Sequence, residues 1–313
     1  MASIIIKQEN KYFNKLKKSI DVNSLTDEQS NRLSVELGII HATKSSKTVY
    51  MAHCIANKLR EEGYPFAIRG VLPNLFIFYL LGITKISPYD DRLKYVLPYQ
   101  VAIGEISIPK PINDIDFSVP VCTRGEIVDY VLTEFQSDTD FYVYGLPGED
   151  NELVGFKLVL FKKGDNPYNH GFSKYSTYPG LYDSGLPYIT ISGFDPTPIE
   201  LKAATYWEKC LELNEPVNIS NNHGYIPKVL KCREDIWKLI EKTDFSDSTK
   251  LWMYDHIRTG RDITQYDFLI EGLKEAAGDE WEEVRDDLEN ILYIFPITHA
   301  IEQFEYRKEL LVH

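Results

Sequence analysis

The sequence predicts an α+β protein in which a mixed sheet is followed by a mainly helical region. Two observations carry this prediction. Apolar residues recur at helical spacing before residue 63 and again after Pro198, whereas short apolar runs separated by Gly, Pro, Asn and Asp fill the stretch between them. With 43% hydrophobic residues, 21 Tyr and 15 Phe, the 313-residue chain can bury a sizeable core.

Residues 11–63 are expected to be helical. Thr26 followed by Gln29 is a capping-box pattern, and the residues after it carry apolar side chains at helical spacing. A second helix begins near Ser45 or Ser46 and ends at Gly63, a residue that readily takes the left-handed conformation of a helix end. The apolar stripes of the two helices are Leu33, Leu37 and Ile40, then Met51, Ile55 and Leu59.

The middle of the chain is expected to form the sheet. One helix, Arg124 to Phe135, interrupts it. The expected strands are apolar runs bounded by turn residues. They cover residues 101–103, 106–108, 141–144, 156–161 and 188–191.

The remainder is expected to be helical, with a domain boundary near residues 196–198, where the composition changes. Gly260 and Gly278 are expected to separate the later helices. The expected helices cover residues 199–213, 233–242, 249–259, 264–277 and 279–292.

The net charge of −13 and the pI near 5.1 argue against a protein that grips a nucleic-acid backbone over much of its surface, because that contact depends on clustered Lys and Arg. The favoured interpretation is a solvated cytosolic surface. Alternatively, the acidic surface meets a basic partner or the DNA groove of a DNA-binding protein. Residues 1–10 have no signal-peptide pattern, and no apolar run approaches the ~20 residues that span a bilayer. We therefore expect a cytoplasmic protein without membrane contact.

The four cysteines form no CxxC pair and are expected to be buried thiols. His53 and His256 are interpreted as ordinary helix positions, since the seven histidines show no paired metal-ligand spacing. The basic run at Lys15 to Lys18 is interpreted as a solvated face. Lys250, Arg258 and Arg261 can reach nucleic acid, although acidic residues are interleaved with them. The cysteines are Cys54, Cys122, Cys210 and Cys232.

The pair Asp114 and Asp116 is the main candidate for chemistry. On a strand, residues two apart point to the same face, so these carboxylates would lie together and offer Mg²⁺ the oxygen ligands it prefers. Paired carboxylates of this kind support two-metal phosphoryl transfer. The alternative is that the two aspartates form a solvated turn.

Several segments resemble, in the same order, the palm and fingers of bacterial DNA polymerase III alpha subunits of the PolC type. The segment Pro111 to Ser118 resembles the family's Pro-Asp-Ile-Asp-Leu-Asn-Phe-Ser stretch, and Ile189 to Thr197 resembles its Leu-Asp-Ile-Leu-Gly-His-Asp-Asp-Pro-Thr stretch. Phe295 to Ala300 resembles its Phe-Pro-Lys-Ala-His-Ala stretch. The other matching segments are residues 32–70, residues 79–88 and residues 232–236.

The resemblance implies a polymerase-beta-like nucleotidyltransferase palm over residues 1–196, with a reduced thumb, and a helical fingers-like domain over residues 197–313. It implies that Asp114 and Asp116 hold Mg²⁺. It also implies that Arg69, Gly70 and His299 contact the nucleotide. The chain has no room for the family's other domains, so the resemblance is to a truncated form.

The departures from the family pattern fall on positions that do its chemistry. The family's Ser-Arg-Gly-Ser loop, whose serines and backbone amides cradle the triphosphate, here reads Ile68-Arg69-Gly70-Val71-Leu72-Pro73, so both serines are missing. The third metal-binding carboxylate falls on Thr190, a neutral hydroxyl, and the fingers lysine falls on Ile297. A displaced carboxylate, Asp183 or Asp195, is the alternative third ligand.

Three hypotheses follow. The first is a PolC-like pseudo-polymerase that acts by binding the replication machinery, nucleic acid or an opposing protein in a phage or mobile-element conflict. The second is a minimal magnesium-dependent DNA polymerase or nucleotidyltransferase that retains Asp114 and Asp116. The third is a protein whose acidic surface mimics DNA.

Overall fold

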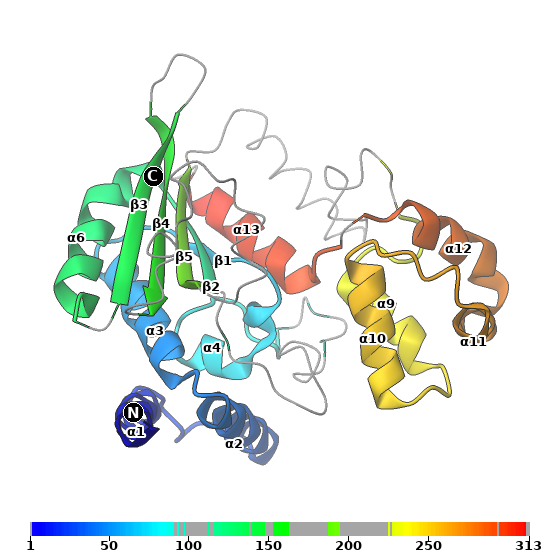
Figure 1. The fold of residues 1–313 in the computed structure, drawn as a ribbon, viewed down its shortest axis with the longest axis horizontal. Helices are drawn as coiled ribbons and strands as arrows, with labels where there is room; N and C mark the ends of the chain where they lie inside the picture. The colour runs from blue at the N-terminus through cyan, green and yellow to red at the C-terminus, as the bar shows by residue number, and fades with distance from the viewer. Residues whose placement is uncertain are drawn as a thin grey trace.

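The structure, a computed structural model, combines a mixed sheet with helices, in agreement with the α+β prediction (Figure 1). It describes residues 2–90, 93, 97, 112, 115–137, 139–147, 153–162, 187–194, 225, 227–292 and 294–310. No helix within these ranges is long and apolar enough to cross a membrane.

Three helices precede the sheet, and two of them confirm the sequence prediction closely. Thr26 caps the second helix: its hydroxyl accepts from the Gln29 backbone, while the Gln29 side chain accepts from the Thr26 backbone. Gly63 has φ +77° after the third helix. The first helix begins nine residues earlier than expected. The helices are α1 (Ala2–Lys18), α2 (Asp27–Ala42) and α3 (Ser46–Glu61).

The five-stranded sheet has the order β1-β2-β5-β4-β3. The pair β2–β5 is parallel and the other neighbours are antiparallel, so the sheet is mixed, as predicted. Three predicted strands are confirmed with longer bounds, the strand considered for Asp116 is present, and one two-residue strand was not predicted. The strands are β1 (Ala67–Ile68), β2 (Ile115–Val119), β3 (Thr139–Pro147), β4 (Leu153–Lys162) and β5 (Pro187–Phe194).

One face of the sheet packs against α3 and α6 (Arg124–Phe135), the second of which has the predicted bounds. The alternate residues of β2 and β5 that point to this face are apolar and fully buried. The helices supply Met51 and Ile55 from α3 and Ile127 and Val131 from α6. The opposite face of β2 and β5 is therefore the one left for polar side chains.

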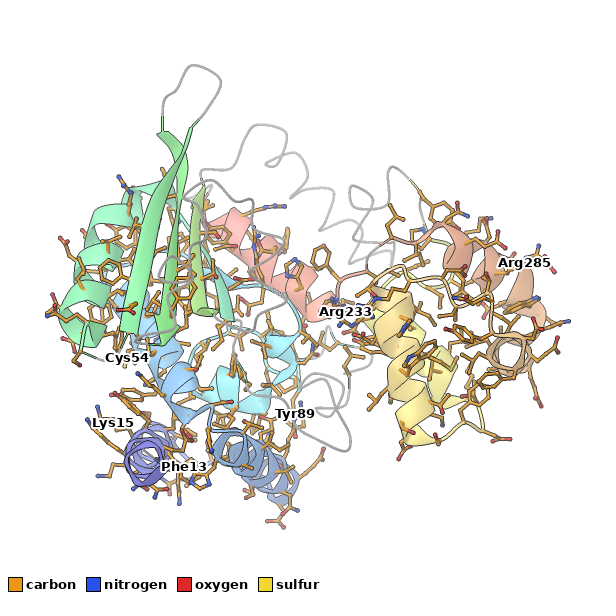
Figure 2. All side chains as sticks on the ribbon, viewed as in Figure 1. Phe13, Lys15, Cys54, Tyr89, Arg233 and Arg285 are labelled. Carbon is orange, nitrogen blue, oxygen red and sulfur yellow. The ribbon has the colours of Figure 1, made fainter. Side chains whose placement is uncertain are left out.

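A second core joins the helices that follow the sheet, which lie in a separate group in Figure 1. All four were predicted within a few residues. They are α9 (Arg233–Glu241), α10 (Asp247–Arg258), α11 (Asp267–Ala277) and α12 (Trp281–Asn290). Arg233, at the start of α9, lies on the side of this group nearer the sheet, whereas Arg285 of α12 lies at its outer end (Figure 2).

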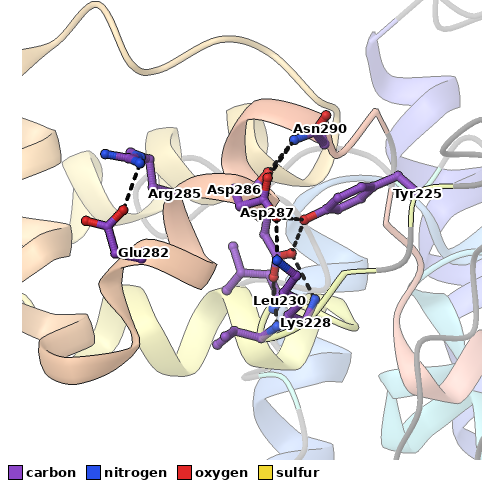
Figure 3. Close-up of polar contacts among 9 residues, drawn as sticks. Tyr225, Lys228, Leu230, Glu282, Arg285, Asp286, Asp287 and Asn290 are labelled. Atoms are coloured by element: carbon purple, nitrogen blue, oxygen red, sulfur yellow. Dashed lines mark hydrogen bonds and ion pairs between the residues drawn. The ribbon is translucent and has the colours of Figure 1, made fainter.

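The segment leading into α9 is fastened to α12 by Asp287, which is completely buried (Figure 3). One of its carboxylate oxygens accepts from the Tyr225 hydroxyl at 2.7 Å and from the Lys228 amide at 2.9 Å. The other accepts from the Val229 and Leu230 amides, both at 2.8 Å. Four donors therefore satisfy one carboxylate, which compensates for burying its charge.

Helix α13 (Ile297–Leu310) was not predicted, and its position matters most for the candidate site. The helix lies beside β1 and contacts both β1 and the 3-10 turn η1 (Leu72–Asn74). Its N-terminal amide, on Ile297, donates to the buried Glu234 carboxylate at 3.0 Å. The polypeptide thus returns from the second core to the edge of the sheet.

Several predictions lie outside the described residues: the strands at 101–103 and 106–108, the helix at 199–213, and the boundary at 196/197. The division into two domains therefore stays a prediction. The expectation of buried thiols is wrong for Cys122, which is exposed, and Cys54 is only half-buried; Cys232 is buried and Cys210 is not described. Cys122 lies in the 3-10 turn η2 (Val121–Thr123), whose neighbouring residues Val121 and Thr123 turn inward while Cys122 faces solvent.

Candidate functional site

The centre of the candidate site is a register pair on neighbouring strands, Asp116 of β2 and Thr190 of β5. The two strands are parallel, so paired residues point to the same face, opposite the apolar core. Thr190 is 2% exposed, and its hydroxyl has no hydrogen-bond partner among the described residues. The position that the family resemblance assigns to a third carboxylate therefore lies beside Asp116 and carries a neutral group.

Arg69 adds a cation at the β1 edge of this polar face. Its backbone nitrogen donates to the Asp116 carbonyl at 2.9 Å, and its Nε atom donates to the Ser118 hydroxyl at 3.0 Å. Ser118 lies two residues after Asp116, so it shares the same face. The strand pairing thus brings Arg69, Asp116, Ser118 and Thr190 together.

The next residue, Gly70, is bonded to His299 of α13. The Gly70 amide donates to the His299 Nδ1 atom at 3.0 Å, so the neutral ring carries its proton on Nε2. The ring is 6% exposed and stacks on Phe295, with 4.2 Å between ring centroids. Burial, together with the Arg69, Arg233 and Arg307 guanidinium groups, lowers the pKa of His299 to about 3.

This bond has a direct consequence for the loop chemistry. The resemblance assigns the glycine amide to the incoming triphosphate, but His299 occupies it in this structure. A neutral imidazole acceptor at this position also offers a phosphate no positive charge. Arg69, Gly70 and His299 therefore lie together, as the resemblance implies, while their role in nucleotide contact stays a prediction.

Glu302, one turn further along α13, fixes the helix to β1 and to the segment after α4 (Phe76–Leu80). Its buried carboxylate accepts from the Ile68 amide at 3.4 Å, the Lys85 amide at 2.8 Å and the Thr84 hydroxyl. Burial raises the pKa of Glu302, and these donors oppose the rise. Because Glu302 and His299 are three residues apart on one helix, the same contacts hold His299 in place.

The loop after Gly70 is fixed in a similar way. The Asn74 side-chain amide donates to the Thr298 hydroxyl at 2.9 Å, and Arg32 donates to the Asn74 carbonyl at 2.6 Å. The buried carboxylate of Glu36 accepts from the Phe76 and Ile77 amides at 3.1 and 2.8 Å, at the start of α4. Burial raises the pKa of Glu36, with Arg32 as the main opposing influence. The loop is thus held by side chains from α2 and α13.

The described residues do not build a two-metal site. They contain no group of three His, Cys, Asp or Glu side chains placed to hold a metal ion. Asp116 is the one predicted metal ligand that they include, because Asp114, Asp183 and Asp195 lie outside the described ranges. Binding of Mg²⁺ stays a prediction.

The basic residues of the helical group are engaged locally. Arg258 and Arg261 both pair with Asp255, the second at 3.6 Å, and the Lys250 ammonium donates to the Glu241 carbonyl at 3.2 Å. The Nδ1 atom of His53 donates to the Leu81 carbonyl at 2.7 Å, and its Nε2 atom bonds the Asn57 side-chain amide at 3.1 Å. The Nδ1 atom of His256 donates to the Trp252 carbonyl, one turn earlier in α10. Both histidines lie in helices, as expected.

The sequence analysis missed three residues that shape the site: Ser118, Glu302 and Glu36. Ser118 had a usable signal, since it follows Asp116 at strand spacing. No local signal in the sequence indicated the roles of the two glutamates, because their partners are distant in the chain. Glu302 and Ile68 are 234 residues apart, and Glu36 and Ile77 are 41 residues apart.

Residues 7–145 match the family model described as the bacterial DNA polymerase III alpha NTPase domain. A curated relative is the DNA polymerase III subunit alpha of Campylobacter jejuni, 28% identical over 115 residues, or 36% of this chain. The match spans about a tenth of the relative's length, at 9%. The residues that the family model matches include α2, α3, β1 and β2, and therefore Arg69, Gly70 and Asp116.

Proposed function

We propose that this chain is a polymerase III alpha-like protein that has lost nucleotidyl transfer and acts by binding. The observation that carries the proposal is the pairing of Asp116 with the buried, neutral Thr190. Two-metal phosphoryl transfer needs anionic oxygens to hold both ions and to balance the charge that develops on the transferred group. A threonine hydroxyl at this position supplies neither function.

The loop supports the same conclusion. The Gly70 amide is bonded to His299, and the two serines of the family loop are replaced by Ile68 and Val71. Removing one preorganised contact to a developing charge costs on the order of 3 kcal/mol, or roughly a hundredfold in rate. The combined changes at the loop and at Thr190 are therefore expected to leave no useful polymerase activity.

In this proposal the fold is a polymerase-beta-like palm followed by a fingers-like helical group, and the protein works in the cytoplasm. The partner is a component of the replication machinery, nucleic acid, or an opposing protein. The net charge of −13 favours a protein partner over a nucleic-acid backbone, because a phosphate backbone is repelled by an acidic surface. A phage or mobile-element origin fits a copy of a host enzyme whose catalytic positions have changed.

The alternative is a minimal magnesium-dependent polymerase that retains Asp114 and Asp116. One observation favours it: Asp116 shares a strand face with Ser118, and Arg69 is bonded to both residues. An enzyme of this kind would use Arg69 to hold the nucleotide near the carboxylates.

Primer extension separates the two functions. The full chain is incubated with a primed template and all four deoxynucleotides, in Mg²⁺ and separately in Mn²⁺, beside the Asp116→Asn variant as a matched control. We expect equal, background-level extension by both proteins. Extension by the parent chain that disappears in Asp116→Asn or Asp114→Asn would establish the alternative.

A DNA-mimic role is tested in the same preparation. If the acidic surface imitates DNA, the protein will displace labelled primer-template from an active replicative polymerase, and added salt will weaken that displacement.

A further inference from the structure

The helical group carries an open groove at the edge of the second core. Its volume is about 340 Å³, at the lower end of the range of ligand pockets. Three aromatic side chains form much of its wall. The lining residues, which we call the aromatic groove, are Ser248, Thr249, Trp252, Tyr266, Phe268 and Leu269.

Aromatic surface is exposed here to an unusual extent. Phe268 is 64% exposed, the highest value among the described large apolar side chains, and Tyr266 is 37% exposed. Burying the exposed part of a phenylalanine against a partner favours binding, because apolar surface is removed from water. An apolar surface left open in this way is typical of an interaction site.

The walls are held rigidly, so the groove is preformed. Trp252 meets Tyr266 edge to face at 5.3 Å, and Phe268 meets Phe245 edge to face at 6.1 Å. Ser246 caps α10, where its hydroxyl accepts from the Thr249 amide. A rigid apolar wall loses little side-chain entropy when a ligand binds.

The rim of the groove is acidic. Asp247 begins α10 next to Ser248, Asp267 begins α11 next to Phe268, and Asp244 precedes Phe245. All three are exposed, and none makes an ion pair within the part of the chain that the structure describes. Three cations of α10 and the turn after it are already engaged: Arg258 and Arg261 with Asp255, and Lys250 with the Glu241 carbonyl.

The acidic rim favours some ligands of the aromatic groove over others. Single-stranded nucleic acid also uses aromatic platforms, but it needs a basic groove for its phosphates, and here carboxylates stand at both helix starts. One face of Trp252 is moreover stacked on His256 at 3.7 Å, so it is closed to a base. A second copy of this chain would bring one acidic rim against another.

We infer that the aromatic groove binds a peptide segment of another protein, with an aromatic or branched aliphatic side chain placed against Phe268 and Trp252 and with Lys or Arg beside it. The apolar side chain supplies the buried area, and the basic residues meet Asp244, Asp247 and Asp267. This inference names one partner class for the binding role proposed above and rests on that role. It does not depend on whether the site around Asp116 and Thr190 is catalytically active.

The test uses a random dodecapeptide library displayed on phage. The library is selected on the immobilised full chain and, in parallel, on its Phe268→Ala variant. Leu292→Ala, which trims another exposed apolar side chain at 44% exposure, is the matched control. Thermal unfolding of each variant verifies that folding is retained, as expected for exposed positions.

The parent chain and Leu292→Ala should enrich peptides that carry an apolar residue flanked by Lys or Arg. By fluorescence polarisation, such peptides should bind Phe268→Ala about tenfold more weakly. The triple change of Asp244, Asp247 and Asp267 to Asn should weaken them further and remove most of their salt dependence.

The inference fails if no peptide is enriched, if the enriched peptides lack basic residues, or if they bind Phe268→Ala as tightly as the parent. It also fails if the chain self-associates through Phe268 in sedimentation, or if an oligothymidylate competes for the groove. Each of these results is separate from the primer-extension assay, which tests the proposed loss of catalysis at the sheet.

Discussion

The backbone nitrogen of Gly70 lies 3.0 Å from Nδ1 of His299, so the end of β1 is bonded to a buried, neutral histidine 229 residues later in the chain. A second proton would go to Nδ1, the atom that accepts from the Gly70 amide, so protonation of the ring breaks this bond. Protonation of His299 should therefore weaken the attachment of α13 to the loop after β1.

The stability of the protein should decrease in acid because of His299. The unfolded chain takes up this proton near the ordinary pKa of 6.5, whereas the folded chain takes it up only near 3. The free energy of unfolding therefore falls as the pH drops from 6.5 towards 3, by up to about 5 kcal/mol from this residue. Urea unfolding of His299→Asn, which keeps an acceptor for Gly70, should show a flatter pH dependence. An unchanged slope would mean that His299 is not the titrating group.

Titration of Glu234 should change the stability in the opposite direction, with a loss as the pH rises. Burial raises its pKa from 4.5 to about 7, against the opposing effect of the Ile297 amide. The folded chain thus holds a proton that the unfolded chain releases, and the free energy of unfolding falls as the pH rises from 4.5 to 7. The full effect is on the order of 3 kcal/mol. Glu234→Gln keeps the acceptor and should be more stable than the parent above pH 7. The exposed Glu241→Gln on the same helix is the control and should leave the pH dependence as it is.

The two adjacent aspartates of α12 should differ sharply. Asp287→Asn turns an amide donor toward the Val229 and Leu230 amides and should destabilise the protein by about 3 kcal/mol or more. Asp286 pairs with Lys228 at 2.8 Å on the surface, with 40% of its side chain exposed, so Asp286→Asn should cost far less stability than Asp287→Asn. Chemical denaturation of both variants measures the difference. Equal losses would contradict the structural role of Asp287.

Replacing each of two helix glycines with alanine should change the stability of the protein in opposite directions. A Cβ atom added at Gly272 of α11 would lie 2.3 Å from the Phe245 ring, so Gly272→Ala should destabilise by about 1 to 3 kcal/mol. A Cβ atom at Gly125 of α6 meets nothing within 4 Å, so Gly125→Ala should stabilise by about 0.5 to 1 kcal/mol. Thermal melting of the two variants gives the comparison. Stabilisation by both would show that Phe245 does not pack against α11.

Thr190 gives a test of the candidate site that needs no activity. Its buried hydroxyl has no partner among the described residues, so Thr190→Val should be neutral or stabilising by about 1 kcal/mol. Thr190→Asp should destabilise the apoprotein, because it buries a carboxylate beside Asp116. Both variants are measured by chemical denaturation without metal. A loss of more than about 1.5 kcal/mol in Thr190→Val would mean that the hydroxyl is bonded.

Local signals in the sequence were sufficient for most of the described elements. Thr26 and Gln29 marked the start of α2, and the apolar spacing of α6 and of the helices α9 to α12 gave their positions within a few residues. These signals work because a cap or an amphipathic stripe involves residues within one or two turns.

The sequence did not reveal the features that depend on distant partners. The Phe295 to Ala300 segment was noted as a motif, but nothing in it indicated that α13 continues to residue 310 and packs beside β1. The strand Ala67–Ile68 is too short for an alternation pattern. The pairing of Asp116 with Thr190 was reached only through a resemblance, because a register between strands is set by tertiary packing rather than by local spacing.

The return of α13 to β1 also constrains how the chain is made. During synthesis, β1 leaves the ribosome more than two hundred residues before Glu302, whose carboxylate receives the Ile68 amide. Domains generally fold in the order in which they emerge, yet this edge of the sheet has to wait for residues 297–310. A nascent chain halted before that helix should expose the β1 edge to proteases and chaperones, and release of the remainder should protect it.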